Sequence, residues 1–294
     1  MRPHPSRHGG KAGSRLIKLL TLWTLILGAG GGLAAAGLIA VNQPADAVTL
    51  CRQGRLKSST LVLIDTTDPL TEIQARRLRA AVEAERDELP RGGRLTLLLL
   101  NPDDAGAPVE LASLCNPGRA ADADPLFHTT SRIDKDWQEG FAAPLDAALA
   151  KAGATGAAAA SPIIATIAAA LTRPDFDRRV PARRLLIVSD LLEYTKGGYS
   201  QLAGGNLWKA YAASALARDM PLDLHGVSVA VDYLARPRFA AVQGDTHRRF
   251  WVRLFTEAGA PQVQFIGLRS PAPEITDSGG EETARLSRNK GRTQ

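Results

Sequence analysis

The feature that most constrains the fold is an alternation of short apolar runs with longer amphipathic segments. Runs of strand length occupy residues 60–65, 94–100, 109–115, 182–190, 222–231 and 262–268. The segments between them show the helical spacing of apolar residues, at residues 71–89, 131–152, 161–173, 206–219 and 238–259. This alternation predicts an α/β fold with a doubly wound, mostly parallel sheet whose two faces are covered by helices.

Local signals add detail to this order. Residues 101–108 are too few for a parallel crossover, so the run at 109–115 is expected to form one antiparallel edge strand. Thr71, with Gln74 three places later, predicts a capping box at a helix start. Ser161 before Pro162 predicts the N-cap of another helix. The helix over residues 131–152 is expected to be interrupted at Pro144.

An uncharged apolar stretch covers residues 19–41, and residues 1–18 before it contain five basic residues and no acidic one. Its 23 residues suffice for one transmembrane helix across a hydrocarbon core of about 30 Å. The basic leader predicts a cytoplasmic N-terminus, hence a single-pass protein of the bacterial inner membrane with a periplasmic main domain. The alternative is a secretory signal cleaved after Ala47, which would export the same domain.

The chain is therefore expected to have five parts: a leader (1–18), a transmembrane helix (19–41), a linker (42–58), an α/β domain (59–268) and a disordered tail (269–294). The net charge of +6 comes mostly from the leader, because the rest of the chain has 31 basic against 30 acidic residues. A nearly neutral domain has no general attraction for phosphate backbones, so no nucleic acid is expected as a partner.

Cys51 and Cys115 are the two cysteines of the chain. An exported domain lies in an oxidising compartment, where a pair of cysteines without an odd one left over favours a disulfide. Two separate buried thiols are the alternative. Metal binding by the pair is not expected, because no further Cys and no group of His accompanies them.

Two strand-like runs end in dense groups of polar side chains. Asp65, Thr67 and Asp68 follow the first run, and Ser189 and Asp190 end the fourth. Open α/β sheets bind ligands outside the carboxyl ends of their strands, so these residues are expected to share one crevice if the two strands are neighbours. Hydroxyl and carboxylate oxygens are ligands that Mg²⁺ prefers, which makes Mg²⁺ the candidate cofactor. The alternative is that the same residues only form turns and helix caps.

The strand order and these polar groups resemble the von Willebrand factor A-type domain over residues 58–268. In that family an Asp-x-Ser-x-Ser motif follows the first strand. A Thr in a later loop and an Asp after the fourth strand complete a metal-ion-dependent adhesion site. The resemblance implies that the metal ligands are Asp65, Thr67, Ser161 and Asp190. Pro69 stands at the position of the second Ser and has no side-chain oxygen, which leaves Asp68 as the substitute ligand.

A glycine-containing loop with aromatic residues, residues 191–205, follows Asp190. Such a loop beside a crevice suits contact with a protein partner, whereas an ordinary loop without a partner is the alternative. In the helix over residues 238–259, Phe250 and Trp251 are expected in the core and His247 at the surface or its boundary. The expected partner-binding residues are Asp68, Ser189, Tyr194, Lys196 and Tyr199.

These observations favour a membrane-anchored, extracytoplasmic binding module that recognises a protein partner in the cell envelope. We expect that the protein is not an enzyme, and we assign no catalytic residue, because the sequence contains no G-x-S-x-G, H-E-x-x-H or Walker motif. One alternative is a metal-dependent phosphohydrolase with Asp65 as the nucleophile, although Thr67 stands where such enzymes carry a second Asp. Another is an inert structural scaffold, which explains Pro69 most simply.

Overall fold

A computed structural model describes residues 45–52, 54, 56–122, 130–152 and 158–266. The described chain from Asp46 onward forms one compact unit. The leader, the apolar stretch at residues 19–41 and the tail predicted for residues 269–294 lie outside the described residues. Among the helices that are described, none combines the length and the apolar character that a membrane crossing requires.

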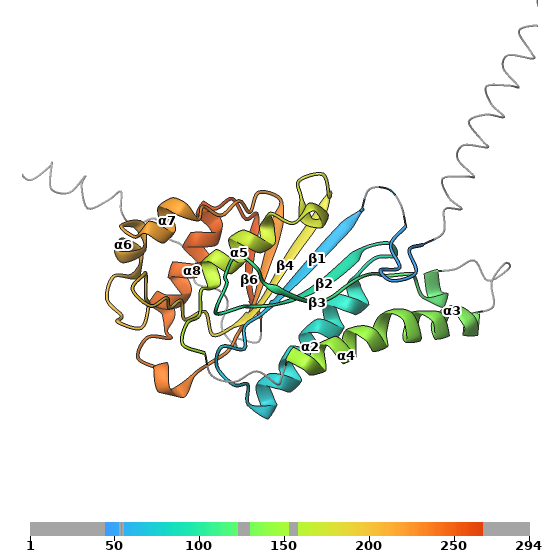
Figure 1. Cartoon of the computed structure of the whole chain (residues 1–294), viewed down its shortest axis with the longest axis horizontal. Coiled ribbons are helices and arrows are strands. Elements are labelled where there is room, and N and C mark those ends of the chain that lie inside the picture. The colour runs from blue at the N-terminus through green and yellow to red at the C-terminus, as the bar shows by residue number, and fades with distance from the viewer. Residues whose placement is uncertain (1–44, 53, 55, 123–129, 153–157, 267–294) are drawn as a thin grey trace, which may run out of the picture. The chain divides into compact units, whose positions relative to one another are not determined.

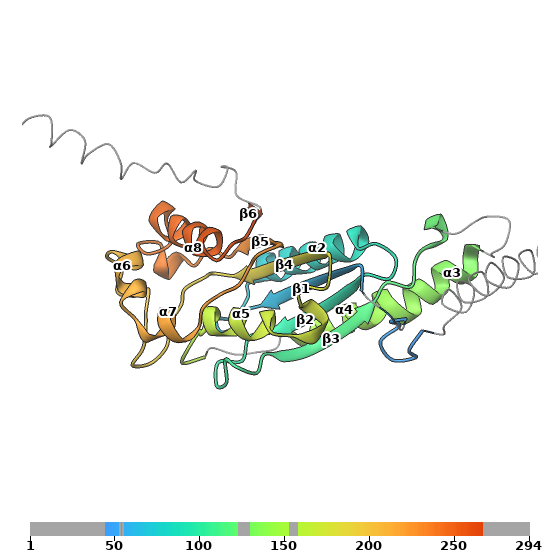
Figure 2. The same ribbon diagram turned by 90° about the horizontal axis from the view of Figure 1, so that it is seen from above.

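The described strands form one six-stranded sheet, and neighbouring strands lie side by side from β3 at one edge to β6 at the other (Figure 2). β3 pairs antiparallel with β2, and every other pairing is parallel. The predicted fold class, a mostly parallel α/β sheet with one antiparallel edge strand, is confirmed. In the order β3-β2-β1-β4-β5-β6, the strands span Val109–Cys115, Arg94–Leu99, Ser58–Ile64, Ala182–Ser189, Val227–Tyr233 and Gln262–Ile266.

Helices cover both faces of the sheet (Figure 1). Alternate residues of β1 enter two different cores, because successive side chains of a strand point to opposite faces. Leu61 and Leu63 pack with α5, α6 and α8, whereas Val62 and Ile64 pack with α2 and α4. The helices span Glu72–Glu88 (α2), Thr130–Trp137 (α3), Ala143–Ala152 (α4), Ile163–Leu171 (α5), Leu207–Ala212 (α6), Ala215–Asp219 (α7) and Asp245–Glu257 (α8).

Pro144 does not interrupt its helix in the way the sequence suggested. It lies in the first turn of α4, and a π-helical stretch, Gln138–Ala142, connects α3 directly to α4. A proline inside a helix lacks an N–H and crowds the carbonyl four residues earlier. The wider π-helical turn just before Pro144 accommodates both effects, so the helix continues through the proline.

Three further differences from the prediction exceed two residues or divide an element. β5 begins at Val227 because Gly226 turns the chain with a φ of 73°. The segment over residues 206–219 divides into α6 and α7, since the Ser214 hydroxyl accepts the N–H of Ala217 and starts a new helix. α8 begins at Asp245, seven residues later than predicted. The capping box between Thr71 and Gln74 is present as predicted.

Candidate functional site

The two polar strand ends meet at the carboxyl edge of the sheet. β1 and β4 are parallel neighbours with Ile64 opposite Val188, and the N–H of Asp65 donates to the carbonyl of Val188. This pairing places the loop after β1 beside the loop after β4. The condition for a shared crevice, that these two strands are neighbours, is therefore met.

Asp65 is the centre of the hydrogen-bonding at this edge. Its Oδ1 accepts the N–H of Thr67 at 3.0 Å and the hydroxyl of Thr67 at 2.6 Å. Its Oδ2 accepts the hydroxyls of Ser189 at 2.7 Å and Ser161 at 3.3 Å. A buried carboxylate requires such donors, because an unpartnered charge in the interior is costly. The carboxylate of Asp65 thus connects the loops after β1 and β4 to the segment before α5.

Ser161 has a different local role from the one predicted. α5 begins at Ile163, and the residue at its N-cap is Pro162, which has no side chain to accept a hydrogen bond. The cap is supplied from another loop, since Oε2 of the buried Glu193 side chain accepts the N–H of Ile164 at 2.8 Å. The hydroxyl of Ser161 is consequently available for Asp65.

Asp190 is paired with an arginine that the sequence analysis did not single out. Its Oδ2 accepts Nε of Arg236 at 2.9 Å, and its Oδ1 accepts the N–H of Leu192 at 3.0 Å. Burial, followed by the nearby charge of Asp65, raises the pKa of Asp190 to about 6, against the lowering effects of the Leu192 N–H and Arg236. Asp190 is therefore mostly ionised at neutral pH and forms a buried ion pair.

The guanidinium of Arg236 also reaches the loop after β1. Its Nη1 donates to the carbonyl of Pro69 at 2.8 Å and to Oε1 of Gln74 at 3.4 Å. Its Nη2 donates to the carbonyl of Asp68 at 3.1 Å. The side chain is only 9 % exposed. One buried cation thereby joins the loops that follow β1, β4 and β5.

A small cavity of about 170 Å³ opens at this edge. The carboxylate of Asp68 forms an ion pair at its rim with Arg238, whose side chain is 63 % exposed. Residues from the loops after β1, β4 and β5 and from the segment before α5 surround the cavity, and they include Thr67, Asp68, Ser161, Asp190, Tyr194 and Arg238. We call this cavity the crevice.

Three of the four predicted metal ligands, Thr67, Ser161 and Asp190, line the crevice, and Asp65 is hydrogen-bonded to two of them. A competing cation lies beside them. Arg236 contacts Asp190, the last residue of the resemblance motif, and the carbonyl of Pro69, where the motif lacks its second hydroxyl. A divalent ion about 5 Å from a guanidinium would be repelled by roughly 7 kcal/mol at an effective dielectric constant of about 20. Within the described residues no three His, Cys, Asp or Glu side chains form a metal-binding group. The guanidinium of Arg236 therefore opposes a divalent cation beside Asp190, and the binding of Mg²⁺ stays a prediction.

The predicted partner-binding residues fall into two groups. Lys196 is exposed, Tyr194 is half-buried, and Asp68 and Tyr194 line the crevice. Ser189 and Tyr199 are buried, and their hydroxyls donate to Asp65 and to the carbonyl of Leu207. Neither Ser189 nor Tyr199 presents its side chain at the surface in this structure.

A buried polar network behind the crevice was also missed. His247, expected at the surface or its boundary, is fully buried, whereas Phe250 and Trp251 are buried as predicted. Nε2 of His247 donates to the Leu191 carbonyl at 3.0 Å and to Oε1 of Gln201 at 2.9 Å. Both partners only accept, so Nδ1 is the acceptor for the Tyr233 hydroxyl at 2.7 Å.

This network supports an unusual backbone conformation next to Asp190. Leu191 has a φ of 57°, in the left-handed region that a leucine adopts at a cost of about 1–2 kcal/mol. Its N–H donates to the hydroxyl of Ser189 at 2.8 Å, and its carbonyl accepts Nε1 of Trp251 at 3.0 Å in addition to His247. A strained backbone conformation persists only where the surrounding structure holds it in place, and such residues cluster at functional sites. The turn therefore fixes the direction in which Asp190 enters the crevice.

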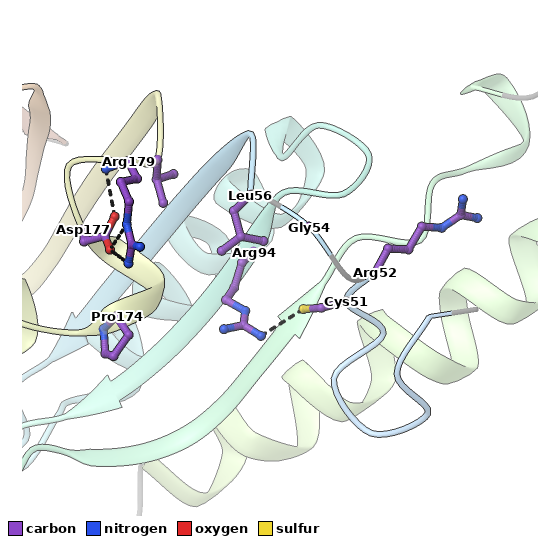
Figure 3. A pocket seen from close by; sticks show the side chains of 9 residues that line it. Cys51, Arg52, Gly54, Leu56, Arg94, Pro174, Asp177 and Arg179 are labelled. Atoms are coloured by element: carbon purple, nitrogen blue, oxygen red, sulfur yellow. Dashed lines mark hydrogen bonds and ion pairs between the residues drawn. The ribbon is translucent and has the colours of Figure 1, made fainter. Parts of the chain in front are cut away.

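A larger cavity, about 610 Å³, lies at the opposite end of the parallel strands beside the disulfide of Cys51 and Cys115 (Figure 3). Nη2 of Arg94 donates to Sγ of Cys51 at 3.1 Å, and Arg179 is hydrogen-bonded to Asp177. Arg52 points away from both of these groups in Figure 3. Arg94 and Arg179 of this cavity are each paired with an acidic side chain of the same fold, Asp175 and Asp177.

Comparisons with known proteins leave the family open. No model of a protein family matches the chain, and no curated protein matches its sequence. One similar solved structure is an aerotolerance-related membrane protein from Bacteroides fragilis NCTC 9343 with multiple mutations to serines. It is 11% identical with a TM-score of 0.34, covering 79% of this chain and 99% of its own.

A second similar structure is the conserved hypothetical protein BatB from Bacteroides thetaiotaomicron. It is 10% identical with a TM-score of 0.35, covering 80% of this chain and 100% of its own. Both scores are low, and neither likeness supports a conclusion about this chain. The resemblance to the von Willebrand factor A-type domain stays a prediction.

Proposed function

We propose that this chain is a membrane-anchored, extracytoplasmic binding module that recognises a protein partner through the crevice. The observation that carries the proposal is the convergence of loops from three neighbouring strands on one small cavity with a half-exposed rim. Binding residues concentrate on loops that a rigid sheet positions, and the carboxyl edge is where open α/β sheets bind ligands. The anchor is the apolar stretch at residues 19–41.

The charges of the crevice indicate the chemistry of the partner. Asp68 and Asp190 line the crevice with two carboxylates, against the one lining guanidinium of Arg238, whereas Asp65 and Arg236 are not among the lining residues. The remaining negative charge, with the aromatic ring of Tyr194 in the lining, suits a Lys or Arg side chain of the partner. The crevice is therefore proposed to receive a cationic side chain, whereas a carboxylate would meet net repulsion.

Two features favour binding over phosphohydrolase chemistry. Asp65 is 3 % exposed, and both of its oxygens already accept hydrogen bonds, so it is poorly placed for nucleophilic attack. The guanidinium of Arg236 also opposes the metal ion that such an enzyme uses. An inert scaffold remains the competing function, because the same hydrogen bonds would serve a purely structural role.

Site-specific photocrosslinking in living cells tests the proposal. A photoreactive amino acid would be placed at Tyr194, Lys196 or Arg238, and at Glu88 as an exposed control on the far end of α2. We expect one defined protein to be captured at the crevice positions and not at Glu88. The same crosslink should weaken when Asp68→Arg reverses the charge at the rim.

Capture that is equal at Glu88 and at the crevice positions, or that persists unchanged in Asp68→Arg, would support the scaffold. The membrane topology is tested separately, by the accessibility of the domain to protease added to spheroplasts. Digestion of the domain from the periplasmic side is expected if residues 19–41 anchor it as proposed.

A further inference from the structure

We infer that Arg236 is a built-in replacement for a divalent cation, so that the crevice is assembled and works without metal. The part of this inference that concerns recognition rests on the proposed function. The part that concerns assembly depends on this chain alone and can be measured without any partner.

The first argument is where the guanidinium donates. It contacts the Asp190 carboxylate and the backbone carbonyls of Asp68 and Pro69, which are all oxygen acceptors. A hard cation at this edge would draw on the same kind of oxygen ligands. The guanidinium reaches them as a planar donor with several N–H groups fixed in space, which a single buried arginine can supply.

The second argument is that hydrogen bonds also fix the backbone of Arg236. Its own backbone N–H donates to Oε1 of Gln243 at 2.6 Å. The side-chain amide of Gln243 donates in turn to the carbonyls of Asp190 at 2.9 Å and Leu234 at 3.0 Å. Hydrogen bonds within the fold thus hold Arg236 in the loop after β5, and its position does not depend on an incoming ligand.

The third argument comes from comparison with its neighbour in sequence. Arg238, two residues later, is 63 % exposed and pairs with Asp68 at the rim. Arg236 is 9 % exposed and pairs with a carboxylate that is 4 % exposed. A buried carboxylate needs a permanent counter-charge, whereas a rim pair contributes little. The two arginines therefore provide a matched pair of variants.

The test uses the full-length chain purified in detergent, with thermal unfolding followed by intrinsic tryptophan fluorescence. We expect the unfolding midpoint of the wild type to be the same in EDTA and in millimolar Mg²⁺, Mn²⁺ or Ca²⁺. Arg236→Ala should lower the midpoint by several degrees, and Arg238→Ala should change it little. Millimolar methylguanidinium or Mn²⁺ should restore part of the loss in Arg236→Ala and none in Arg238→Ala.

Metal binding is measured directly by equilibrium dialysis against Mn²⁺. The wild type should retain no Mn²⁺ above the Asp190→Asn background, and Arg236→Ala should gain binding. If Arg236→Ala does not fold, Arg236→Lys is used, and it should fold and remain insensitive to Mn²⁺ because it keeps the charge. Stabilisation of the wild type by any of the metals would overturn the inference. So would an Arg236→Ala midpoint that is unchanged, or lowered and restored by neither cation.

These outcomes are separable from those of the proposed function. The unfolding and dialysis measurements contain no partner, so a failed crosslink leaves them valid. Conversely, a crosslink at Tyr194 that is abolished by EDTA would contradict metal independence while supporting partner binding.

Discussion

The hydroxyl of Ser189 donates a 2.7 Å hydrogen bond to the carboxylate of Asp65 across 124 residues of sequence, and both side chains are buried. This contact joins the end of β4 to the loop after β1. It also orients Ser189 so that its oxygen accepts the N–H of the strained residue Leu191. The carboxylate of Asp65 is therefore expected to matter for stability whether or not the crevice binds a ligand.

Removing that carboxylate should destabilise the domain strongly. Asp65→Ala leaves the hydroxyls of Thr67, Ser161 and Ser189 without their acceptor, and an unsatisfied buried group costs about 1–3 kcal/mol. We expect a loss of about 3–5 kcal/mol in the free energy of unfolding, measured by urea denaturation, and a smaller loss in Asp65→Asn. Asp68→Asn at the half-exposed rim is the control, with an expected loss below about 1 kcal/mol. Equal losses of unfolding free energy in Asp65→Ala and Asp65→Asn would contradict this account.

Glu193 should make the domain less stable as the pH rises. Burial raises the pKa of Glu193 to about 8 from a normal value of 4.5, and the charge of Asp65 adds to the shift. The folded state therefore binds more protons than the unfolded state between these values, and stability falls as pH increases through that window. The shift corresponds to roughly 4–5 kcal/mol.

Glu193→Gln tests this assignment, because glutamine keeps the shape of the protonated acid. We expect the variant to be more stable than the wild type at about pH 9 and similar to it at about pH 5. Urea denaturation at both pH values gives the difference. A wild type that gains stability relative to the variant as the pH rises would show that Glu193 is ionised in the fold.

The fold and the place of the site were predictable because their signals are local. The apolar run of β1 and the Thr71 capping box depend on a few adjacent residues. Asp65 and Asp190 were found because both follow apolar strands, and parallel strands bring their carboxyl ends to one edge.

The chemistry of the site was not predictable because its partners are distant in sequence. Arg236 is 46 residues from Asp190 and 168 from Asp68, in a loop with no periodic pattern. A signal did exist in Arg236 and Arg238, two cations that follow a buried strand at the edge where the carboxylates gather. His247 was misplaced for a related reason, since its burial is set by Leu191, Gln201 and Tyr233 from other elements.

Acid should destabilise the domain through His247. Burial lowers the pKa of His247 to about 4 from 6.5, with Arg248 adding to the effect and the hydrogen bond to Leu191 opposing it. Between about pH 6.5 and 4, His247 is protonated in the unfolded state but stays neutral in the folded state. The stability of the fold therefore falls as the pH decreases through this range. The wild type should lose roughly 3 kcal/mol over this window through His247.

The matched variant for this prediction is His247→Gln, which keeps a donor and an acceptor on a neutral side chain. We expect the variant to be less stable than the wild type at neutral pH, with a difference that narrows as the pH falls from about 6.5 to 4. Fluorescence-monitored denaturation across this range measures the narrowing. A difference that stays constant with pH would mean that His247 does not titrate on unfolding.

Loss of the disulfide should destabilise the domain at the end opposite the crevice. Cys51 and Cys115 are 64 residues apart, and opening a loop of this length costs about 4 kcal/mol in the chain-entropy model. The double variant Cys51→Ser/Cys115→Ser should therefore unfold at a markedly lower urea concentration than the oxidised wild type. Reduced wild type should resemble the double variant.

Removing the disulfide also tests whether partner recognition depends on only one end of the sheet. The bond ties the segment before β1 to the end of β3, whereas the crevice is built from the loops after β1, β4 and β5. Photocrosslinking from Tyr194 should consequently persist in the double serine variant at a temperature where that variant remains folded. Loss of the crosslink in a folded double variant would instead mean that partner recognition extends to the cavity beside Cys51 and Arg94.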